Sequence, residues 1–307
     1  MLKQIDFLGK RKLAAMLSGL LLIIAIVSLA AQGLKLGIDF TGGTLVEIGY
    51  KQSVDLKVMR AALETAGFDD ASVQHFGSSQ EVLIRLQPRE GLSNAQLSTE
   101  VAAAASSAMA VQGDLRRVEF VGPQVGDELT EDGGLALLYS MFGILIYVAW
   151  RFEYKFALGS VAALAHDVMI TLGFFSIFQL EFDLTVLAAV LAVIGYSLND
   201  TIVVYDRIRE NFRMLRKGSP EQVMNTSLNQ TLSRTLMTSL TTLLVLVALA
   251  LLGGEIIHNF AVALIIGVVI GTYSSIFVAS PLVLILGVSK EDLMEPEIEG
   301  EDVDMMP

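Results

Sequence analysis

The sequence predicts an α-helical polytopic membrane protein with six transmembrane helices and one external α+β domain. Hydrophobic residues make up 53% of the 307 residues, and the mean hydropathy is +0.60. Soluble domains are roughly 45–50% apolar, so this chain is too apolar for that class. Six stretches are near the ~20 apolar residues that cross a ~30 Å hydrocarbon core. Between the first two, segment 33–133 alternates apolar and polar residues as a folded domain does.

The apolar runs define the order of the chain. The predicted spans are 13–32, 134–150, 156–178, 184–205, 235–252 and 260–286. Residues 1–12 form a cytoplasmic N-terminus, and residues 134–288 form a five-helix transmembrane bundle with a cytoplasmic loop at about 206–234. The tail at 289–307 holds eight acidic residues and one lysine, which is typical of a solvated, disordered end.

Lysine and arginine residues set the predicted orientation. They gather at the N-terminus and after the second and fourth spans, whereas the connections at 179–183 and 253–259 contain neither. Because cytoplasmic loops are the basic ones, both termini are predicted to be cytoplasmic and segment 33–133 external. The first span also resembles a signal peptide, with Ser28-Leu29-Ala30 as a cleavage site, but its long apolar run favours a retained anchor.

The external segment has the element order βαββαβ. Strands are predicted at 44–50, 71–76, 81–86 and 116–121, and helices at 54–66 and 94–111. This order indicates a ferredoxin-like sandwich of helices on an antiparallel sheet. About 100 residues are enough for one small core.

A glycine-rich motif, GIDFTGG, occupies residues 37–43 where the first span leaves the membrane. Gly37, Gly42 and Gly43 allow a sharp turn and close backbone contact, with Asp39 between them. The motif lacks the lysine and hydroxyl of a nucleotide-binding loop. We therefore predict a structural turn, and no ATP-binding signature occurs elsewhere.

Ionisable and amide side chains inside the predicted spans are the candidate functional residues, because such groups are costly in lipid. The third span carries His166 and Asp167, the fourth carries Asn199 and Asp200, and Arg234 opens the fifth. Burial raises the pKa of a carboxyl group and a nearby guanidinium lowers it. An aspartate beside a movable arginine can therefore take up and release a proton.

Structural interpretations of the same residues remain open. Asp200 and Arg234 could form a static ion pair that fixes helix packing, and His166 with Asp167 could be a hydrogen-bonded packing pair. Gly267 and Gly271 form a GxxxG pattern in the sixth span, which indicates close contact with an unidentified helix. Ser274, Ser275 and Ser280 continue this run of small residues.

Composition excludes several classes of function. The chain has no cysteine and three scattered histidines, so neither a thiolate nor a histidine metal site is expected. The net charge of −12 argues against nucleic-acid binding. An intramembrane enzyme is disfavoured because no serine nucleophile is paired with a histidine.

Several long motifs in order resemble the SecD/SecF family of protein-export membrane proteins, in the resistance-nodulation-division superfamily. The resemblance runs from residue 7 to about 287. It rests on His166-Asp167 and on GIDFTGG at 37–43, VEFVGPQVGDEL at 118–129, WRFE at 150–153, GYSLNDTIVVYDRIREN at 195–211 and NQTLSRTLMTS at 229–239.

The resemblance implies a bacterial inner-membrane subunit that pairs with SecD, associates with the SecYEG channel, often with YajC, and acts on unfolded protein in transit. It implies that Asp200 and Arg234 belong to a proton path, that a further essential aspartate comes from SecD, and that the proton gradient replaces any cofactor. Two other functions are considered. A small-molecule or lipid exporter of the superfamily usually carries both halves in one chain, and a passive assembly scaffold would need no proton.

Overall fold

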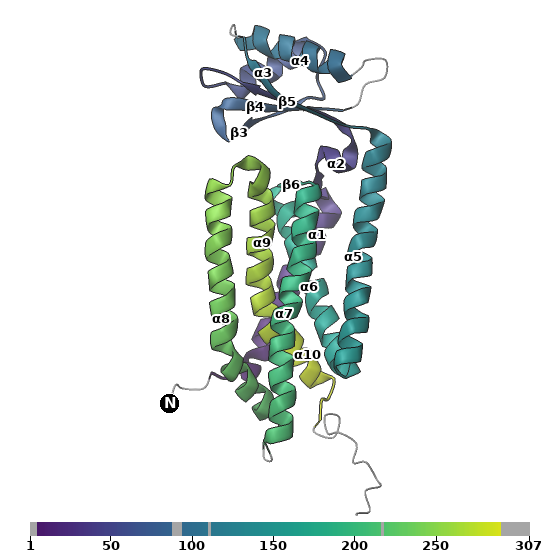
Figure 1. The fold of residues 1–307 in the computed structure, drawn as a ribbon, viewed down its shortest axis with the longest axis vertical. Helices are drawn as coiled ribbons and strands as arrows, with labels where there is room; N and C mark the ends of the chain where they lie inside the picture. The colour runs from purple at the N-terminus through teal and green to yellow at the C-terminus, as the bar shows by residue number, and fades with distance from the viewer. Residues whose placement is uncertain (1–4, 88–93, 110–111, 216–217, 290–307) are drawn as a thin grey trace, which may run out of the picture.

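The computed structural model describes residues 5–87, 94–109, 112–215 and 218–289. A bundle of long, nearly parallel helices carries a small α+β domain at one end (Figure 1). Within the described residues, six helices are long and apolar enough to cross a membrane. The predicted fold class is therefore confirmed. The predicted acidic tail, apart from its first residue, lies outside the described residues.

The long helices continue beyond the predicted spans. They are α1 (Arg11–Gln32), α5 (Pro123–Arg151), α6 (Tyr154–Phe178), α7 (Leu184–Met214), α8 (Pro220–Leu252) and α9 (Glu255–Ser274), followed by a π-helical segment (Ser275–Ala279) and α10 (Ser280–Ile285). A short 3₁₀ turn, Leu8–Lys10, precedes α1.

Helix caps explain why these bounds differ from the predicted ones. Proline occupies the first turn of α5 and of α8, where its missing N–H costs nothing. Ser219 and Gln222 form a reciprocal capping box at the start of α8. The segment predicted as a loop at about 206–234 is consequently mostly helical. Hydropathy marks only the apolar part of a helix, so it missed these polar extensions.

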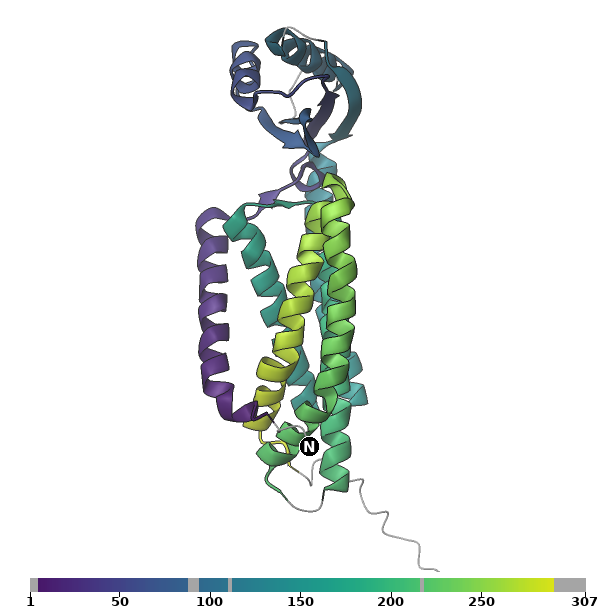
Figure 2. The same cartoon turned by 90° about the vertical axis from the view of Figure 1, so that its left-hand side faces the viewer.

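The external domain has the predicted ferredoxin-like order. Its elements are β2 (Gly43–Gly49), α3 (Leu56–Thr65), β3 (Ser72–Phe76), β4 (Ser78–Leu86), α4 (Asn94–Met109) and β5 (Asp114–Val121). The sheet order is β3-β4-β2-β5, and every pair is antiparallel. Figure 2 shows both helices on the face away from the bundle. Val46, Ile48 and Ile84 from the sheet pack there against Met59 and Leu63 of α3.

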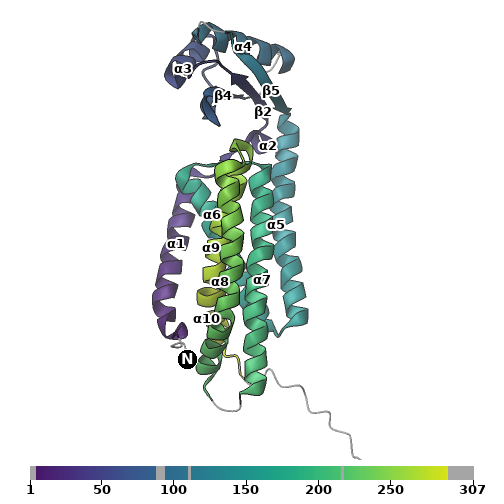
Figure 3. The same ribbon diagram turned by 60° about the vertical axis from the view of Figure 1, so that its left-hand side comes forward.

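Short elements between the domain and the bundle were not predicted. They are β1 (Lys35–Leu36), α2 (Ile38–Thr41) and β6 (Glu181–Phe182). Strand β6 follows α6 and pairs in parallel with β1, which follows α1. Helix α2 contains part of the glycine-rich motif and contacts the start of α5 (Figure 3). The segments that leave the membrane are therefore joined by backbone contacts below the sheet.

The centre of the bundle is formed by α6, α7 and α9. About half of the residues in the apolar stretch of each of these helices are buried. In α1, α5 and α8, fewer than a fifth of them are buried. Large apolar side chains on the outer faces of α1, α5 and α8, among them Leu13, Phe142 and Leu244, suit contact with lipid or with another protein. Helices α6, α7 and α9 meet at side chains that have no exposed surface, such as Asp167 and Ser274.

Candidate functional site

Two carboxylates are buried in the centre of the bundle. Asp167 of α6 has no exposed surface, and Asp200 of α7 is 6% exposed. Each lies within the mainly apolar, membrane-spanning part of a helix that packs against α9. A buried carboxylate is tolerated only when its oxygens have hydrogen-bond partners. The identity of those partners therefore defines what each site can do.

Asp200 is held by hydroxyl groups from two other helical segments. Thr235 of α8 donates to Oδ1 at 2.7 Å, and Ser275 of the π-helical segment donates to Oδ2 at 2.6 Å. A hydroxyl group can donate to a carboxylate or rotate to accept from a carboxylic acid. The partners of Asp200 can thus form hydrogen bonds to it in both protonation states. This is what a proton-binding site within a membrane requires.

Asp167 forms a second, adjacent network. Ser197 of α7 and Ser274 of α9 both donate to Oδ2, at 2.6 and 2.7 Å. Oδ1 lies 2.9 Å from Nδ1 of His166. The imidazole is 4% exposed and stacks on Tyr273 with 6.3 Å between ring centroids. His166 and Asp167 thus contact one another as well as separate partners.

Ser274 and Ser275 link the two carboxylates. From the sequence, these serines were predicted only to allow close helix packing. They are consecutive, yet Ser274 bonds to Asp167 and Ser275 bonds to Asp200. The helix changes to π geometry at Ser275, and the hydroxyl of Ser280 donates to the Ser275 carbonyl at 2.9 Å. Single π turns are frequent at functional sites. Two serines in one span were a detectable signal, but their partners are distant in the sequence.

Arg234 does not form the contact with Asp200 that we expected. Its side chain is exposed on α8, and it makes no ion pair with any described carboxylate, although its charge acts on Asp200 through space. The next residue, Thr235, faces inward and bonds to Asp200 instead. Successive helical residues point about 100° apart, so the stripe of Arg234 and Thr238 faces outward.

Asn199 is likewise exposed, although Asp200 beside it is buried. It shares one face of α7 with Ala188, Ala192 and Gly195, all exposed and spaced by three or four residues. The structure therefore separates the candidate residues into two groups. Asp200, Asp167 and His166 lie inside the bundle, whereas Asn199 and Arg234 lie on its outer surface.

The glycine-rich motif fastens the external domain to α5 and α7. A Cβ atom on Gly42 would lie 2.9 Å from the Cα of Pro123, and Gly42 and Gly43 have φ of 69° and 138°. Gly37 donates its N–H to the Phe182 carbonyl at 2.8 Å. Asp39 accepts a bond from the N–H of Leu184, the first residue of α7, at 2.9 Å. The motif is thus a structural junction at the outer end of the helix that carries Asp200.

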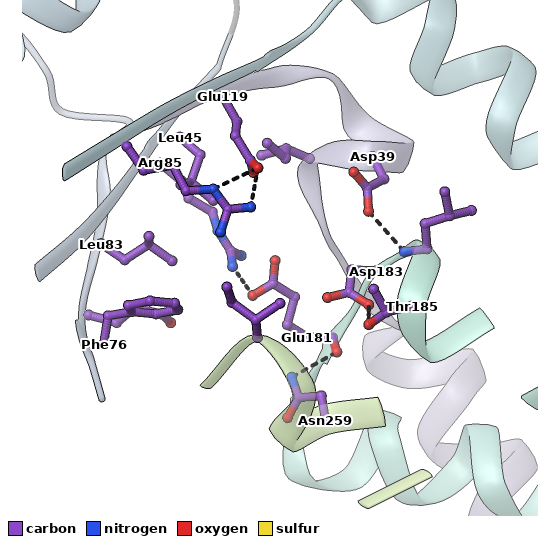
Figure 4. A pocket seen from close by; sticks show the side chains of 15 residues that line it. Asp39, Leu45, Phe76, Leu83, Arg85, Glu119, Glu181, Asp183, Thr185 and Asn259 are labelled. Atoms are coloured by element: carbon purple, nitrogen blue, oxygen red, sulfur yellow. Dashed lines mark hydrogen bonds and ion pairs between the residues drawn. The ribbon is translucent and has the colours of Figure 1, made fainter. Parts of the chain in front are cut away.

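Charged side chains make a second contact at this junction. Arg85 of β4 forms an ion pair with Glu181 of β6, and Figure 4 shows the pair between the sheet and the bundle. The pair lines a cavity of about 350 Å³. Burial lowers the pKa of Arg85, while the charges of Asp183 and Asp39 raise it, and Asn259 of α9 donates to the Glu181 carbonyl. Opposite charges therefore hold the domain against the bundle.

Arg85→Met is expected to lower the unfolding temperature of the full chain in detergent, because it leaves Glu181 partly buried without its partner. Glu181→Gln should cost less in the Arg85→Met background than in the wild type. Arg117→Met is the control, since Arg117 pairs with Glu119 within β5 and both are more than a third exposed. Equal effects of the two arginine substitutions would contradict this assignment.

Gly267 and Gly271 of α9 lie against α7. A Cβ atom on Gly267 would overlap a methyl carbon of Val193, and one on Gly271 would lie 3.0 Å from the Cβ of Ser197. The helix that the sequence left unidentified is therefore α7. This close approach brings Ser274 and Ser275 to the two carboxylates. Across the described residues, no group of three or more His, Asp or Glu side chains is placed to hold a metal ion.

Comparisons with known proteins agree with this architecture. The model of the C-terminal region of the protein export membrane proteins SecD and SecF matches residues 101–289, and the SecD/SecF GG motif matches residues 27–54. Protein translocase subunit SecF of Vibrio alginolyticus is 53% identical, with 99% of this chain and 98% of the relative covered. The SecF subunit of Pseudomonas aeruginosa is 48% identical, with 99% and 98% covered.

A solved structure shows the same fold. The crystal structure of SecDF, a translocon-associated membrane protein from Thermus thermophilus, superposes with a TM-score of 0.84 at 40% identity. The match covers 92% of this chain and 39% of that one, so the present chain spans well under half of the longer protein. With full-length relatives at about half identity and a matching fold, the chain belongs to the SecF family of protein translocase subunits.

Proposed function

We propose that this chain is an accessory subunit of the Sec protein-export translocase that acts with SecD and uses the proton-motive force to complete export. The observation that carries the proposal is Asp200, which is buried at the centre of the bundle and, within the described residues, is hydrogen-bonded by two rotatable hydroxyl groups. A proton moving through the full field gains ~2.3 kcal/mol per 100 mV, which is enough to bias a two-state element. No cofactor is needed for this role.

The outer face formed by α7 and α8 is the proposed docking surface for SecD. Arg234 is exposed within a span, and a guanidinium facing lipid is costly, so another protein would cover it. Asn199 lies on the exposed stripe of α7, where Gly195 and Ala192 would allow a helix to approach closely. A carboxylate from that helix would pair with Arg234. The SecYEG channel, YajC and the unfolded substrate are further proposed partners.

The proposed orientation follows from the basic residues. Both termini are cytoplasmic, and the ferredoxin-like domain lies in the periplasm of a cell whose inner membrane holds the bundle. Helix α7 connects the two regions, because Asp200 lies within it and its first residue, Leu184, bonds to Asp39. Protonation of Asp200 would move α7, and the junction would pass that movement to the external domain.

Arg234 provides the test of the proposed coupling. In inverted membrane vesicles that contain SecD, Arg234→Met is expected to remove the stimulation of late export by a proton gradient. Arg234→Lys should retain part of it, because a positive charge remains. Arg207→Met is the control, since Arg207 is partly exposed and paired with Glu210. Gradient-dependent export that survives Arg234→Met would favour a passive assembly scaffold.

A further inference from the structure

A groove of about 520 Å³ runs along the inner side of α1, at the end of the bundle away from the external domain. Its volume lies in the range of ordinary ligand sites. Small residues of α1 and α6, Ala15, Gly19 and Ala162, form part of its lining. A Cβ atom on Gly19 would meet no atom within 4 Å. The opposite wall consists of Phe277, Val278, Pro281, Leu282 and Ile285.

The length of the groove along α1 is about the thickness of one lipid leaflet. Its lining on α1 extends from Arg11, at the first turn, to Leu22 near the middle of the helix. Eleven residues of helix rise about 16 Å, which is about half of a ~30 Å hydrocarbon core. An extended acyl chain that starts at the membrane surface would therefore fit along its length.

Positive charge lies at the mouth and apolar side chains lie behind it. Lys12 lines the groove, is exposed, and has no ion-pair partner among the described residues. Arg11 is held in place by Glu221 and by the Leu8 carbonyl, so one guanidinium edge is fixed at the mouth. Lysine side chains at such a position reach the phosphate level of a bilayer. This distribution of charge matches an anionic headgroup with an acyl chain beneath it.

A buried imidazole lines the same groove. His166 is 4% exposed and bonds to Asp167 through Nδ1, while its Nε2 has no hydrogen-bond partner in the described part of the chain. Tyr273, which stacks on His166, also bonds to Ser18 of the groove at 3.0 Å. A molecule in the groove would thus touch His166, which is a hydrogen-bond partner of Asp167.

We propose that this groove binds an anionic phospholipid of the leaflet opposite the external domain, with the phosphate at Arg11 and Lys12 and one acyl chain along Ala15, Gly19 and Leu22. The site is separate from the proposed docking surface on α7 and α8, and the proposal does not depend on proton coupling. Its failure would therefore leave the proposed function intact.

Native mass spectrometry of the full chain purified with SecD tests the site, with phosphatidylglycerol and phosphatidylethanolamine of identical acyl chains as probes. The wild type is expected to retain phosphatidylglycerol preferentially. Gly19→Phe fills the groove and should weaken retention about tenfold or more. Ile23→Phe is its control, since Ile23 is 61% exposed on the same helix and does not line the groove.

A second pair of variants tests the headgroup contact. Lys12→Gln should remove the preference for phosphatidylglycerol while phosphatidylethanolamine binding is unchanged, and Lys10→Gln, outside the groove lining, should not. Equal retention of the two lipids by the wild type, or full retention by Gly19→Phe, would overturn the proposal. Cross-linking of a Gly19→Cys variant to a protein instead of a lipid would also overturn it, and is specific because the chain has no other cysteine.

Discussion

Asp200→Asn is expected to abolish the proton-gradient stimulation of late export while assembly with SecD is retained. Asparagine has nearly the same shape as aspartate, and its carbonyl oxygen can accept the bond from Thr235. Its amide nitrogen would face Ser275, whose hydroxyl can rotate to accept. The substitution therefore removes the exchangeable proton of the carboxyl group but preserves the hydrogen bonds. A loss of coupling without a loss of folding follows.

The measurement is the rate of late export in inverted vesicles that contain SecD, with and without the gradient. Asp206→Asn is a matched control on the same helix, because Asp206 is about half exposed and its contacts with Arg151 and Arg209 are 3.5 and 3.8 Å long. An Asp200→Asn variant that assembles with SecD and still responds fully to the gradient would show that the carboxylate is structural.

Substitution of the serines that bond to the two carboxylates is expected to reduce the response of export to the gradient by different amounts. Ser275→Ala removes one donor and should reduce the gradient response only in part, since Thr235 still bonds to the carboxylate. Ser274→Ala separates the two networks, because Ser274 bonds to Asp167 and leaves Asp200 untouched. An equal loss in both variants would indicate that the two carboxylates act together through the π-helical segment.

The six spans and the ferredoxin-like order could be predicted because each depends on a local pattern of apolar residues. Asp200 and Asp167 were detectable for a similar reason, as charges within apolar runs. Their partners were not, because Ser275 is 75 residues away from Asp200 in the chain and only packing joins them. The orientation of Arg234 could not be predicted from the sequence. A helical pattern cannot fix the absolute rotation of α8, so the inward residue proved to be Thr235.

The short elements between the external domain and the bundle could not be predicted for a different reason. Strand β6 and helix α2 are too short to show periodicity, and their positions depend on pairing with β1 and on bonds such as that between Asp39 and Leu184. The glycine-rich motif was visible, but a cluster of glycines does not reveal what approaches it. In the structure, the segment that approaches the motif is the start of α5, at Pro123 and Gly126.

Gly267→Leu is expected to destabilise the bundle more than the same substitution at a span glycine that has open space around it. Gly267 lies so close to Val193 of α7 that even a Cβ atom would overlap its side chain. Extra atoms in a packed interior typically cost about 1–3 kcal/mol, and here two helices must also separate. Separation would draw Ser274 and Ser275 away from the carboxylates. The variant should therefore have a lower unfolding temperature in detergent and a weaker response to the gradient.

Gly143→Leu on α5 is the matched control, because a Cβ atom there would meet nothing within 4 Å. It should be neutral or slightly stabilising, since leucine has a higher helix propensity than glycine. If the loss of stability in Gly267→Leu is caused by overlap with Val193, a smaller residue at position 193 should reduce it. Gly267→Ala should be less damaging when Val193 is also changed to alanine, because the smaller side chain makes room for the new methyl group. If the double variant is no more stable than Gly267→Ala alone, contact between α7 and α9 is not what requires glycine at this position.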